Sequence, residues 1–393
     1  MRVSVGIDVA KEIHWATAMC PQGKLLLSRA VKNDPHDLGV LLGELRALGD
    51  ELLVGLDLLG GVAALTQATL AAHQIPVVHV PGIVVNRARA ATVGGESKSD
   101  PRDARIIADQ VRSRSDLRAI TLRDEVSEEL RLLVGRRTDL MQEQNRRLSR
   151  LRDLLCSINP GLERLLEVTT KGHLTLLSFF VTAGELRAAG EAGLREKLEG
   201  AVRPAPLKGL IEAILASAAS HQVRVPGEGV AAELVRELAR EALQTRTRML
   251  EIEKRLNMLL TQHEDAPIIR TLPGMGTVLT AELIAEVGSV LRFDSPDSLA
   301  SAAGLAPVLR QSGKMRFTRR AFGGNKGLKR VFYQSAFASL RSPESLAFYQ
   351  RKRVEGKRHQ QAVIALARRR INVLYAMVKH RQPYQPNDRP PST

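Results

Sequence analysis

The chain has 393 residues and a formal net charge of +16 at pH 7, and its length predicts two or three domains. So basic a chain indicates a polyanionic partner, either a nucleic acid or an anionic membrane surface. Two cysteines exclude a disulfide framework, and an aromatic content of 3% disfavours a stacking platform for single strands. The sequence shows neither a secretory leader nor an uncharged apolar run of about 18 residues, so we expect a cytoplasmic protein without a membrane span.

The first part of the chain has the pattern of a mixed α/β sheet. Three strand-like runs are followed by helix, strand, helix, strand and helix, an order in which a buried apolar strand is expected to be parallel. The expected strands are 2–8, 13–20, 24–31, 52–56 and 76–80, and the expected helices begin near 35, 61 and 82. We therefore predict that residues 1–120 form an α/β domain.

Four aspartates of this domain are placed where they can converge. Asp8 and Asp57 each end a predicted strand, and sites in open α/β sheets lie at such carboxyl ends. Asp100 and Asp103 lie at the start of a predicted helix, on one face of its first turn. Clustered carboxylates repel unless a cation neutralises them, and hard oxygen ligands suit Mg²⁺ or Mn²⁺. The pattern favours a site for two metal ions about 4 Å apart, which suits in-line displacement at phosphorus.

The same aspartates also have a simpler interpretation. Asp100 is a suitable helix N-cap and Asp103 a suitable third helical residue, while Asp8 and Asp57 can each be a solvated turn residue. Under this interpretation the protein binds nucleic acid without catalysis. The basic residues Lys98 and Arg105, which flank the helical pair, are candidate nucleic-acid contacts in either case.

Residues 121–265 are predicted to form a long helical arm. Apolar residues recur in a heptad-like pattern among many charges from Asp124 to about Leu166, and a second long helix is expected over roughly 228–264. Together they predict an antiparallel coiled coil that serves dimerisation or acts as a spacer. The stretch 167–227, which is interrupted by Gly and Pro, would form its tip, and its sequence indicates no chemistry.

Residues 266–380 carry two features of nucleic-acid binding, and 381–393 are expected to be a flexible tail. Pro273-Gly274-Met275-Gly276 fits a helix-hairpin-helix turn, whose backbone amides can hold a phosphate. Residues 310–370 contain 17 Lys or Arg and two acids, so nearly the whole net charge lies in about one sixth of the chain. This asymmetry favours a phosphate-binding surface over a solvated face. The candidate contacts here are Gly274, Gly276, Lys314, Arg316, Arg319, Arg320, Lys326 and Arg330.

Ser312 lies within this basic segment, in a predicted flexible loop that contains Gly313. A serine before glycine is normally a turn residue. No histidine or carboxylate nearby in the sequence offers itself as a general base, so a hydrolase triad has no support. A serine can still act as a nucleophile where a metal or another part of the site removes its proton. The residues alone do not select Ser312 as catalytic.

These motifs, in this order, resemble the transposases of the insertion-sequence family numbered one hundred and ten, which are kin to the pilin-gene DNA invertases. The resemblance covers roughly residues 3–380. The matching segments are Gly6-Ile7-Asp8-Val9-Ala10-Lys11, Asp57, Lys98 to Ala104, Pro273 to Gly276, Gly304 to Gly313, and Gly324-Asn325-Lys326-Gly327. One departure is Asp57, where the family pattern usually has the longer Glu.

The resemblance implies a RuvC-like, ribonuclease-H-type N-terminal domain with a DEDD acid set, then a coiled coil and a mainly α transposase domain. By match, the catalytic residues would be the metal ligands Asp8, Asp57, Asp100 and Asp103 and the nucleophile Ser312. The implied reaction is strand cleavage and exchange between donor and target double-stranded DNA through a 5′-phosphoserine intermediate, guided by a structured non-coding bridge RNA. A homodimer or homotetramer is also implied, in which acids of one subunit complete a site with the serine of another.

Three other functions fit parts of the sequence. A RuvC-like endonuclease would use water as its nucleophile and leave Ser312 as a turn residue, so a covalent protein–DNA adduct separates it from a recombinase. A non-catalytic nucleic-acid-binding protein would show no metal-dependent cleavage. A sugar-kinase-like ATPase also begins with a strand that ends in Asp, but it needs further Gly-rich phosphate loops, and Gly60-Gly61 is too little.

Overall fold

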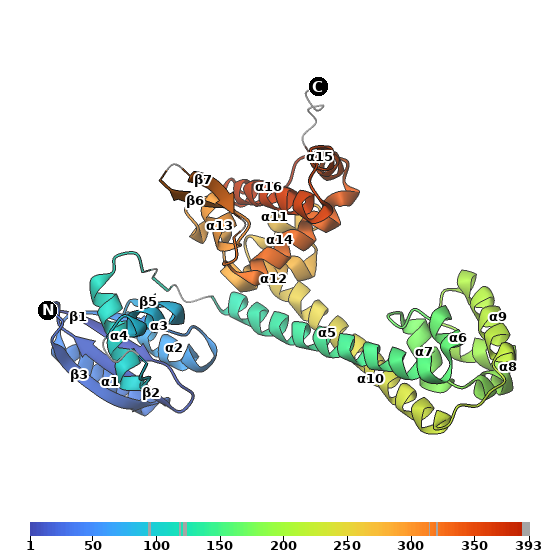
Figure 1. The fold of residues 1–393 in the computed structure, drawn as a ribbon. Helices are drawn as coiled ribbons and strands as arrows, with labels where there is room; N and C mark the ends of the chain where they lie inside the picture. The colour runs from blue at the N-terminus through green and yellow to red at the C-terminus, as the bar shows by residue number, and fades with distance from the viewer. Residues whose placement is uncertain (93–95, 118, 121–123, 314, 320, 387–393) are drawn as a thin grey trace. The chain divides into compact units, whose positions relative to one another are not determined.

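The structure is a computed structural model, and it describes residues 1–92, 96–117, 119–120, 124–313, 315–319 and 321–386. The chain divides into two compact units, Met1–Arg123 and Asp124–Thr393 (Figure 1). The first unit is an α/β domain, and the second is mainly helical.

The first unit is built on a five-stranded mixed sheet in the order β3-β2-β1-β4-β5. β1 pairs antiparallel with β2 and parallel with β4, β2 pairs antiparallel with β3, and β4 pairs parallel with β5. The strands are β1 Arg2–Asp8, β2 Ile13–Met19, β3 Leu25–Lys32, β4 Glu51–Leu56 and β5 Val77–His79. The mixed α/β sheet predicted from the sequence is confirmed, and its strands lie close to their expected positions.

Helices cover both faces of this sheet. α1 and α2 contribute to one core with the apolar side chains of β1, β3 and β4, whereas α3 and α4 contribute to a second cluster with β5. The helices are α1 Pro35–Leu48, α2 Ala64–Ala72, α3 Gly82–Ala90 and α4 Asp100–Ser113, and a 3-10 turn spans Gly61–Ala63. α1 begins where the sequence indicates, because Asp34 accepts a hydrogen bond from the Asp37 amide and Pro35 is the first helical residue.

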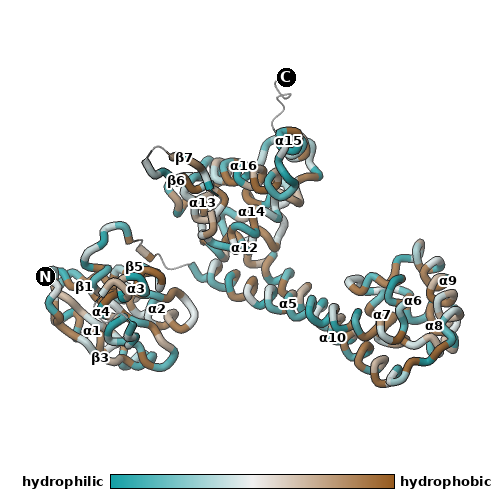
Figure 2. Tube along the Cα trace, viewed as in Figure 1, coloured by the Kyte–Doolittle hydropathy of each residue, from teal (hydrophilic) through white to brown (hydrophobic). Residues whose placement is uncertain are grey.

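Two long helices form an arm in the second unit. They are α5 Glu125–Ile158 and α10 Glu228–Leu260. Their ion pairs show that they run antiparallel, since Arg137 pairs with Glu253 at 2.7 Å and Arg147 pairs with Glu241 at 2.8 Å. Figure 2 shows hydrophilic and hydrophobic residues alternating along the arm, as expected for amphipathic helices that pack through an apolar face and expose a polar face to solvent.

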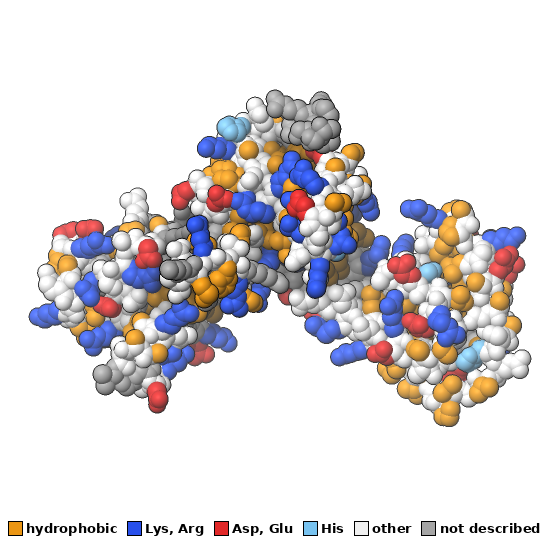
Figure 3. All heavy atoms as spheres, turned by 45° about the horizontal axis from the view of Figure 1, so that its top comes forward, with side chains coloured by type: hydrophobic (Ala, Val, Ile, Leu, Met, Phe, Trp, Pro, Cys, Tyr) orange, Lys and Arg blue, Asp and Glu red, His pale blue; other side chains and the backbone are white. Residues whose placement is uncertain are grey.

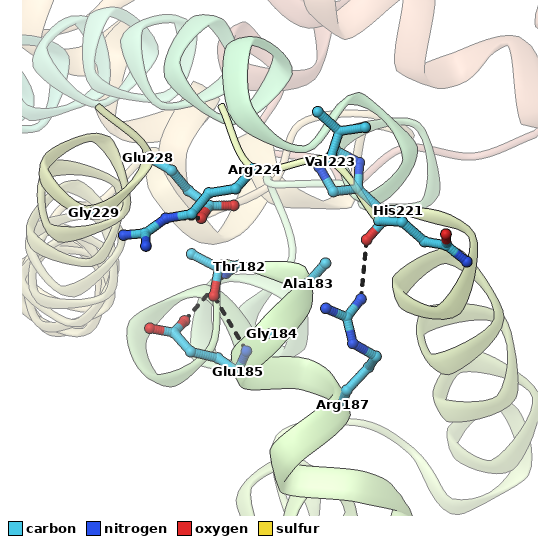
Figure 4. A pocket seen from close by; sticks show the side chains of 11 residues that line it. Thr182, Ala183, Gly184, Glu185, Arg187, His221, Val223, Arg224, Glu228 and Gly229 are labelled. Carbon is cyan, nitrogen blue, oxygen red and sulfur yellow. Dashed lines mark hydrogen bonds and ion pairs between the residues drawn. The ribbon is translucent and has the colours of Figure 1, made fainter. Parts of the chain in front are cut away.

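Four shorter helices at the end of this arm form a tip, and they share a hydrophobic core with the adjoining ends of α5 and α10. They are α6 Pro160–Leu165, α7 Lys171–Phe179, α8 Ala183–Leu198 and α9 Pro204–Ser220. A polar cavity of about 370 Å³ opens beside the start of α8 (Figure 4). There Arg187 donates a hydrogen bond to the carbonyl oxygen of His221 at 3.0 Å, and Thr182 and Glu185 cap α8 reciprocally. The cavity contains none of the site residues predicted from the sequence.

The rest of the second unit is a mainly helical region whose core includes Leu130, Leu256 and Leu260 of the arm. Its helices are α11 Ala266–Thr271, α12 Thr277–Val287, α13 Pro296–Ala302, α14 Lys326–Ala338, α15 Pro343–Val354 and α16 His359–Lys379, with 3-10 turns at Val290–Arg292 and Ser339–Arg341. An antiparallel hairpin, β6 Val308–Ser312 and β7 Met315–Arg319, interrupts the helices. The predicted loop around Ser312 is therefore wrong, because Ser312 ends a strand.

The start of the predicted tail bonds to the helical region. Arg381 donates to Asp265 Oδ1 at 2.7 Å and to Glu264 Oε2 at 2.6 Å, and the Tyr384 amide donates to Thr271 Oγ1 at 2.8 Å. The last seven residues of the tail lie outside the described part of the chain. Among the described helices, none combines the length and the apolar character that crossing a membrane requires.

Candidate functional site

Two glycines in neighbouring strands let α4 approach the sheet closely. Gly6 of β1 and Gly55 of β4 are register partners. A Cβ on Gly6 would lie 2.2 Å from the Ala108 amide nitrogen, and one on Gly55 would lie 2.4 Å from Val111 Cγ2. A side chain at Gly6 would overlap the helix backbone itself, so this position requires glycine if α4 is to stay in place.

This contact places the first turn of α4 beside two strand ends. Side chains alternate along a strand, so Asp8 faces the same side as Gly6, and Asp57 follows Gly55 with the same spacing. Asp100 and Asp103 occupy the first turn of α4, just before the part of the helix that meets Gly6. The structure thus brings the four aspartates predicted from the sequence to the same edge of the sheet.

The charges of these carboxylates act on one another. Burial raises the pKa of Asp8 to about 7, and the negative charges of Asp57, Asp103 and Asp100 contribute to the rise in that order. The positive charge of Lys98 acts in the opposite direction. Like charges on neighbouring carboxylates disfavour the ionised form, and they do so more strongly where burial removes water. The charges of the other three aspartates therefore act on Asp8, the acid at the end of β1.

Asp57 is oriented by its neighbours. The Val9 amide donates to Asp57 Oδ1 at 3.2 Å, which ties the residue after Asp8 to the second acid. His79 Nε2 lies 3.2 Å from the Asp57 backbone oxygen. Burial raises the pKa of Asp57, while the backbone amide hydrogen bonds and the His79 charge act to lower it.

Asp103 is the most buried of the four acids and has a basic partner that the sequence did not indicate. It is 4% exposed, and both of its carboxylate oxygens accept hydrogen bonds from Arg89 Nη1 at 2.6 Å. Arg89, near the end of α3, is itself held by Asn86 Oδ1 at 2.7 Å. Within the described residues, no three His, Cys, Asp or Glu side chains are arranged to hold a metal ion as they stand.

The start of α4 differs by one residue from the sequence expectation. Ser99 is the N-cap and Asp100 is the first helical residue, so the assignment of Asp100 as the cap is wrong. Asp100 is exposed, as are Lys98 and Arg105. An acid in the first turn is favoured by the helix dipole, but capping does not account for Asp100.

Ser312 is exposed at the turn of the β6–β7 hairpin, where its register partner is Met315. Cross-strand partners share a face, and side chains alternate along each strand. Arg319 therefore lies on the same face as Ser312, and Arg316 lies on the opposite face. Every described residue of β7 is exposed, so the hairpin presents both faces to solvent or to a ligand.

The turn between α11 and α12 is anchored on one side by residues of α14 and α16. Gly274 has a φ of +81°, and a Cβ there would lie 2.5 Å from the Ser335 carbonyl oxygen. The buried side chain of Arg370 donates to the Pro273 carbonyl and, at 2.8 Å, to Ser335 Oγ. Burial lowers the pKa of Arg370 to about 10. Gly276, by contrast, is exposed and has open space around it, so the front of the turn is accessible.

The other predicted basic contacts are placed differently from one another. Arg316 and Lys326 are exposed, and the Arg319 guanidinium lies 4.5 Å from the centre of the Phe322 ring. Arg330 forms an ion pair within the protein, because its guanidinium lies 3.2 Å from the buried carboxylate of Glu282. Figure 3 shows Lys and Arg side chains spread over the visible face of this region. Two predicted contacts, Lys314 and Arg320, lie outside the described residues.

Two family models match the chain, one named DEDD_Tnp_IS110 and described as a transposase over residues 5–160, the other described as transposase IS116/IS110/IS902 family over residues 266–350. An IS116 insertion-element protein of Streptomyces clavuligerus is 38% identical over 98% of this chain and 96% of its own length. An IS900 protein of Mycobacterium paratuberculosis is 37% identical over 98% and 97%. The chain belongs to the IS110 family of transposases.

This membership gives the chain its general activity. It is a transposase, an enzyme that recombines DNA, and DNA is its substrate class. A pilin gene-inverting protein of Moraxella bovis is 31% identical over 30% of this chain and 38% of its own length. The first family model spans all four clustered aspartates, and the second spans Ser312. Transposase domains of the DEDD type generally depend on divalent metal ions.

Proposed function

We propose that this transposase cleaves and exchanges DNA strands with Ser312 as nucleophile and with the four aspartates as a divalent-metal site in a RuvC-like, ribonuclease-H-type domain. One observation carries the proposal: Asp8, Asp57, Asp100 and Asp103 converge at one sheet edge, and Asp8 has a pKa of about 7. Holding four acids together is unfavourable without a cation, and such perturbed clusters concentrate at functional sites.

The side chains at this edge fit Mg²⁺ or Mn²⁺ by their chemistry. All four offer hard carboxylate oxygens, and the Val9 amide fixes the orientation of Asp57, which is shorter than the Glu usual in the family. Arg89 now provides the positive partner of Asp103 through two hydrogen bonds. When a metal ion binds, Asp103 would give up these hydrogen bonds and coordinate the metal instead. When bound, the metal supplies charge stabilisation at the scissile phosphate and at the leaving oxygen.

Ser312 brings an exposed hydroxyl to the reaction. Its Oγ attacks phosphorus and gives its proton to a solvent base, while the bond from phosphorus to the 3′-oxygen breaks and that oxygen takes up a proton. The 5′-phosphate then remains on Ser312 as a phosphoserine. Attack by the 3′-hydroxyl of a second strand releases Ser312 and joins the strands. Arg319, on the same face of the hairpin, is placed to bind non-bridging oxygens.

We further propose that the basic surface holds donor and target duplexes together with a structured non-coding RNA, and that the protein acts as a homodimer or homotetramer. The charge excess of residues 310–370 supports this binding, as does the accessible front of the Pro273–Gly276 turn. The tip has no comparable excess of positive charge, because residues 160–227 contain eight Lys or Arg and seven acids.

The test is denaturing electrophoresis of end-labelled DNA after reaction with Mg²⁺. Wild type should give cleavage and a slow-migrating covalent adduct. Ser312→Ala should bind DNA normally and give no adduct, whereas Thr318→Ala, which removes an exposed hydroxyl from the other face of the hairpin, should react like wild type. Asp8→Asn should abolish both products.

Asp50→Asn is the matched control for the acids, because Asp50 is exposed and precedes the amino end of β4. Cleavage without any adduct would show that water is the nucleophile and that the protein is an endonuclease. An adduct formed by Ser312→Ala would place the nucleophile elsewhere. Full activity of Asp8→Asn, or full activity in EDTA, would remove the aspartate cluster from the reaction.

A further inference from the structure

The segments that follow Asp8 and Asp57 are tied together by two side chains from the antiparallel half of the sheet. The first segment, residues 9–12, connects β1 to β2, and the second, residues 58–66, runs into the first turn of α2. His14 lies near the start of β2, and Asn33 directly follows β3. Neither belongs to the acid cluster.

His14 contacts both segments with its two ring nitrogens. It is fully buried, and its Nδ1 accepts a hydrogen bond from the Ala10 amide at 3.1 Å. Because Nδ1 accepts, the neutral ring carries its proton on Nε2, which lies 3.1 Å from Thr66 Oγ1 and donates to it. A single ring therefore holds the turn after Asp8 against the helix that follows Asp57.

Asn33 joins the same two segments independently. Its Nδ2 donates to the Lys11 carbonyl at 3.2 Å and to the Val62 carbonyl at 3.3 Å. The backbone amide of Asn33 donates to the Glu12 carbonyl at 2.9 Å. Together with the hydrogen bond from Val9 to Asp57, these contacts connect the two segments at three separate points.

The side of the sheet on which His14 lies excludes it from the metal cluster itself. Asp8 and Trp15 are register partners, so their side chains share the face covered by α4. His14 precedes Trp15 and faces the opposite side, where it meets α2 through Thr66. His14 is therefore placed to act on the acids chiefly through the backbone that it holds, and the charge of Asp57 also reaches it through space.

We propose that His14 and Asn33 are positioning residues that fix the separation and orientation of Asp8 and Asp57 for metal binding. The inference rests on the proposed metal site. Hydrogen-bond partners behind metal ligands typically change metal affinity by about 10- to 100-fold when removed. Two independent ties to the same pair of segments should each contribute an effect of this kind.

The experiment measures Mn²⁺ binding to the full chain by electron paramagnetic resonance, without DNA. Thr66→Val removes the hydroxyl that His14 contacts and keeps the side-chain shape, and Asn33→Ala removes the second tie at a partly exposed position. Each should raise the Mn²⁺ dissociation constant about 10-fold or more. Thr69→Val is the matched control: Thr69 lies in the same helix α2, its hydroxyl donates to the Leu65 carbonyl of that helix, and its replacement should change the constant less than twofold.

Hydrogen exchange of β1 and β4 in the same samples shows whether the sheet is intact, so a lost fold is not mistaken for lost positioning. Wild-type affinity in both Thr66→Val and Asn33→Ala would overturn the positioning role while leaving the metal site in place. Failure of wild type to bind Mn²⁺ in a manner that Asp8→Asn abolishes would instead overturn the metal site, and the positioning role with it. The two failures are therefore distinguishable.

Discussion

Replacing Asp8 by Asn should stabilise the metal-free first unit while abolishing catalysis. Asp8 has a folded-state pKa of about 7 against a usual value of 3.8, because burial and three neighbouring carboxylates disfavour its charged form. From about pH 4 to about pH 7 the folded protein holds a proton that the unfolded chain has released, so stability falls as the pH rises through this window. Asn carries no ionisable proton, so the Asp8→Asn variant should lack this decline.

The size of the effect follows from the difference between the two pKa values of Asp8. At about 1.4 kcal/mol for each tenfold change in the ionisation constant, the full difference corresponds to about 4 kcal/mol above pH 7. The Asp8 side chain is partly exposed, so solvent screens part of the repulsion, and we expect about 1–3 kcal/mol in favour of the variant at pH 8. At pH 4 the two proteins should be about equally stable.

The assay is native-state hydrogen exchange of the β1 and β4 amides in the full chain with EDTA, at pH 5 and pH 8. Asp50→Asn provides the control, since its exposed side chain lies away from the cluster. A variant that is no more stable than wild type at pH 8 would refute the conclusion that burial and the neighbouring carboxylates disfavour the charged form of Asp8 in the folded protein. Added Mn²⁺ should stabilise wild type and leave Asp8→Asn unchanged.

Three further predictions concern packing and charge. Gly6→Ala should destabilise the first unit by about 3 kcal/mol or more in the same exchange assay, because the added Cβ would overlap the α4 backbone. Gly39→Ala in α1, where space is open, should be neutral or should stabilise the unit by up to about 1 kcal/mol. Combined Arg316→Ala and Arg319→Ala should reduce the slope of log K against log salt for DNA binding by about two, and the tip variant Lys208→Ala with Arg224→Ala should leave it unchanged. Arg370→Leu should lower the unfolding free energy of the second unit by about 1–3 kcal/mol in chemical denaturation, because the Pro273 carbonyl loses its buried donor; unchanged stability would show that water replaces the guanidinium.

Strand-end acids were predictable because their pattern follows from backbone geometry. A short apolar strand that ends on Asp57, beside a first strand that ends on Asp8, puts both carboxylates at the same edge whenever the strands are parallel neighbours. The helical pair Asp100 and Asp103 was predictable for a similar reason, since residues three apart share a face. The sequence did not indicate how closely α4 approaches the sheet, which depends on the pairing of Gly6 with Gly55.

The partners of the site could not be predicted, because they come from other elements. Arg89 reaches Asp103 from α3, and no local pattern distinguishes it from other basic residues near a helix end. His14 sits in an ordinary alternating strand, and its role depends on the distant Thr66. The sequence around Ser312 offered one hairpin signal, Gly313 between two short runs, but the charged and polar residues of these runs give a weak β pattern. The structure shows that Gly313 has a positive φ at the turn.

The most direct measurement of the central claim is mass spectrometry of the trapped protein–DNA adduct. The adduct formed with Mg²⁺ is digested with protease and nuclease, and the residual 5′-nucleotide is located on a peptide. We predict that the added mass lies on Ser312 in a serine phosphodiester. A nucleotide located on any other residue, or a wild-type protein that cleaves DNA and yields no nucleotide-bearing peptide, would contradict the account.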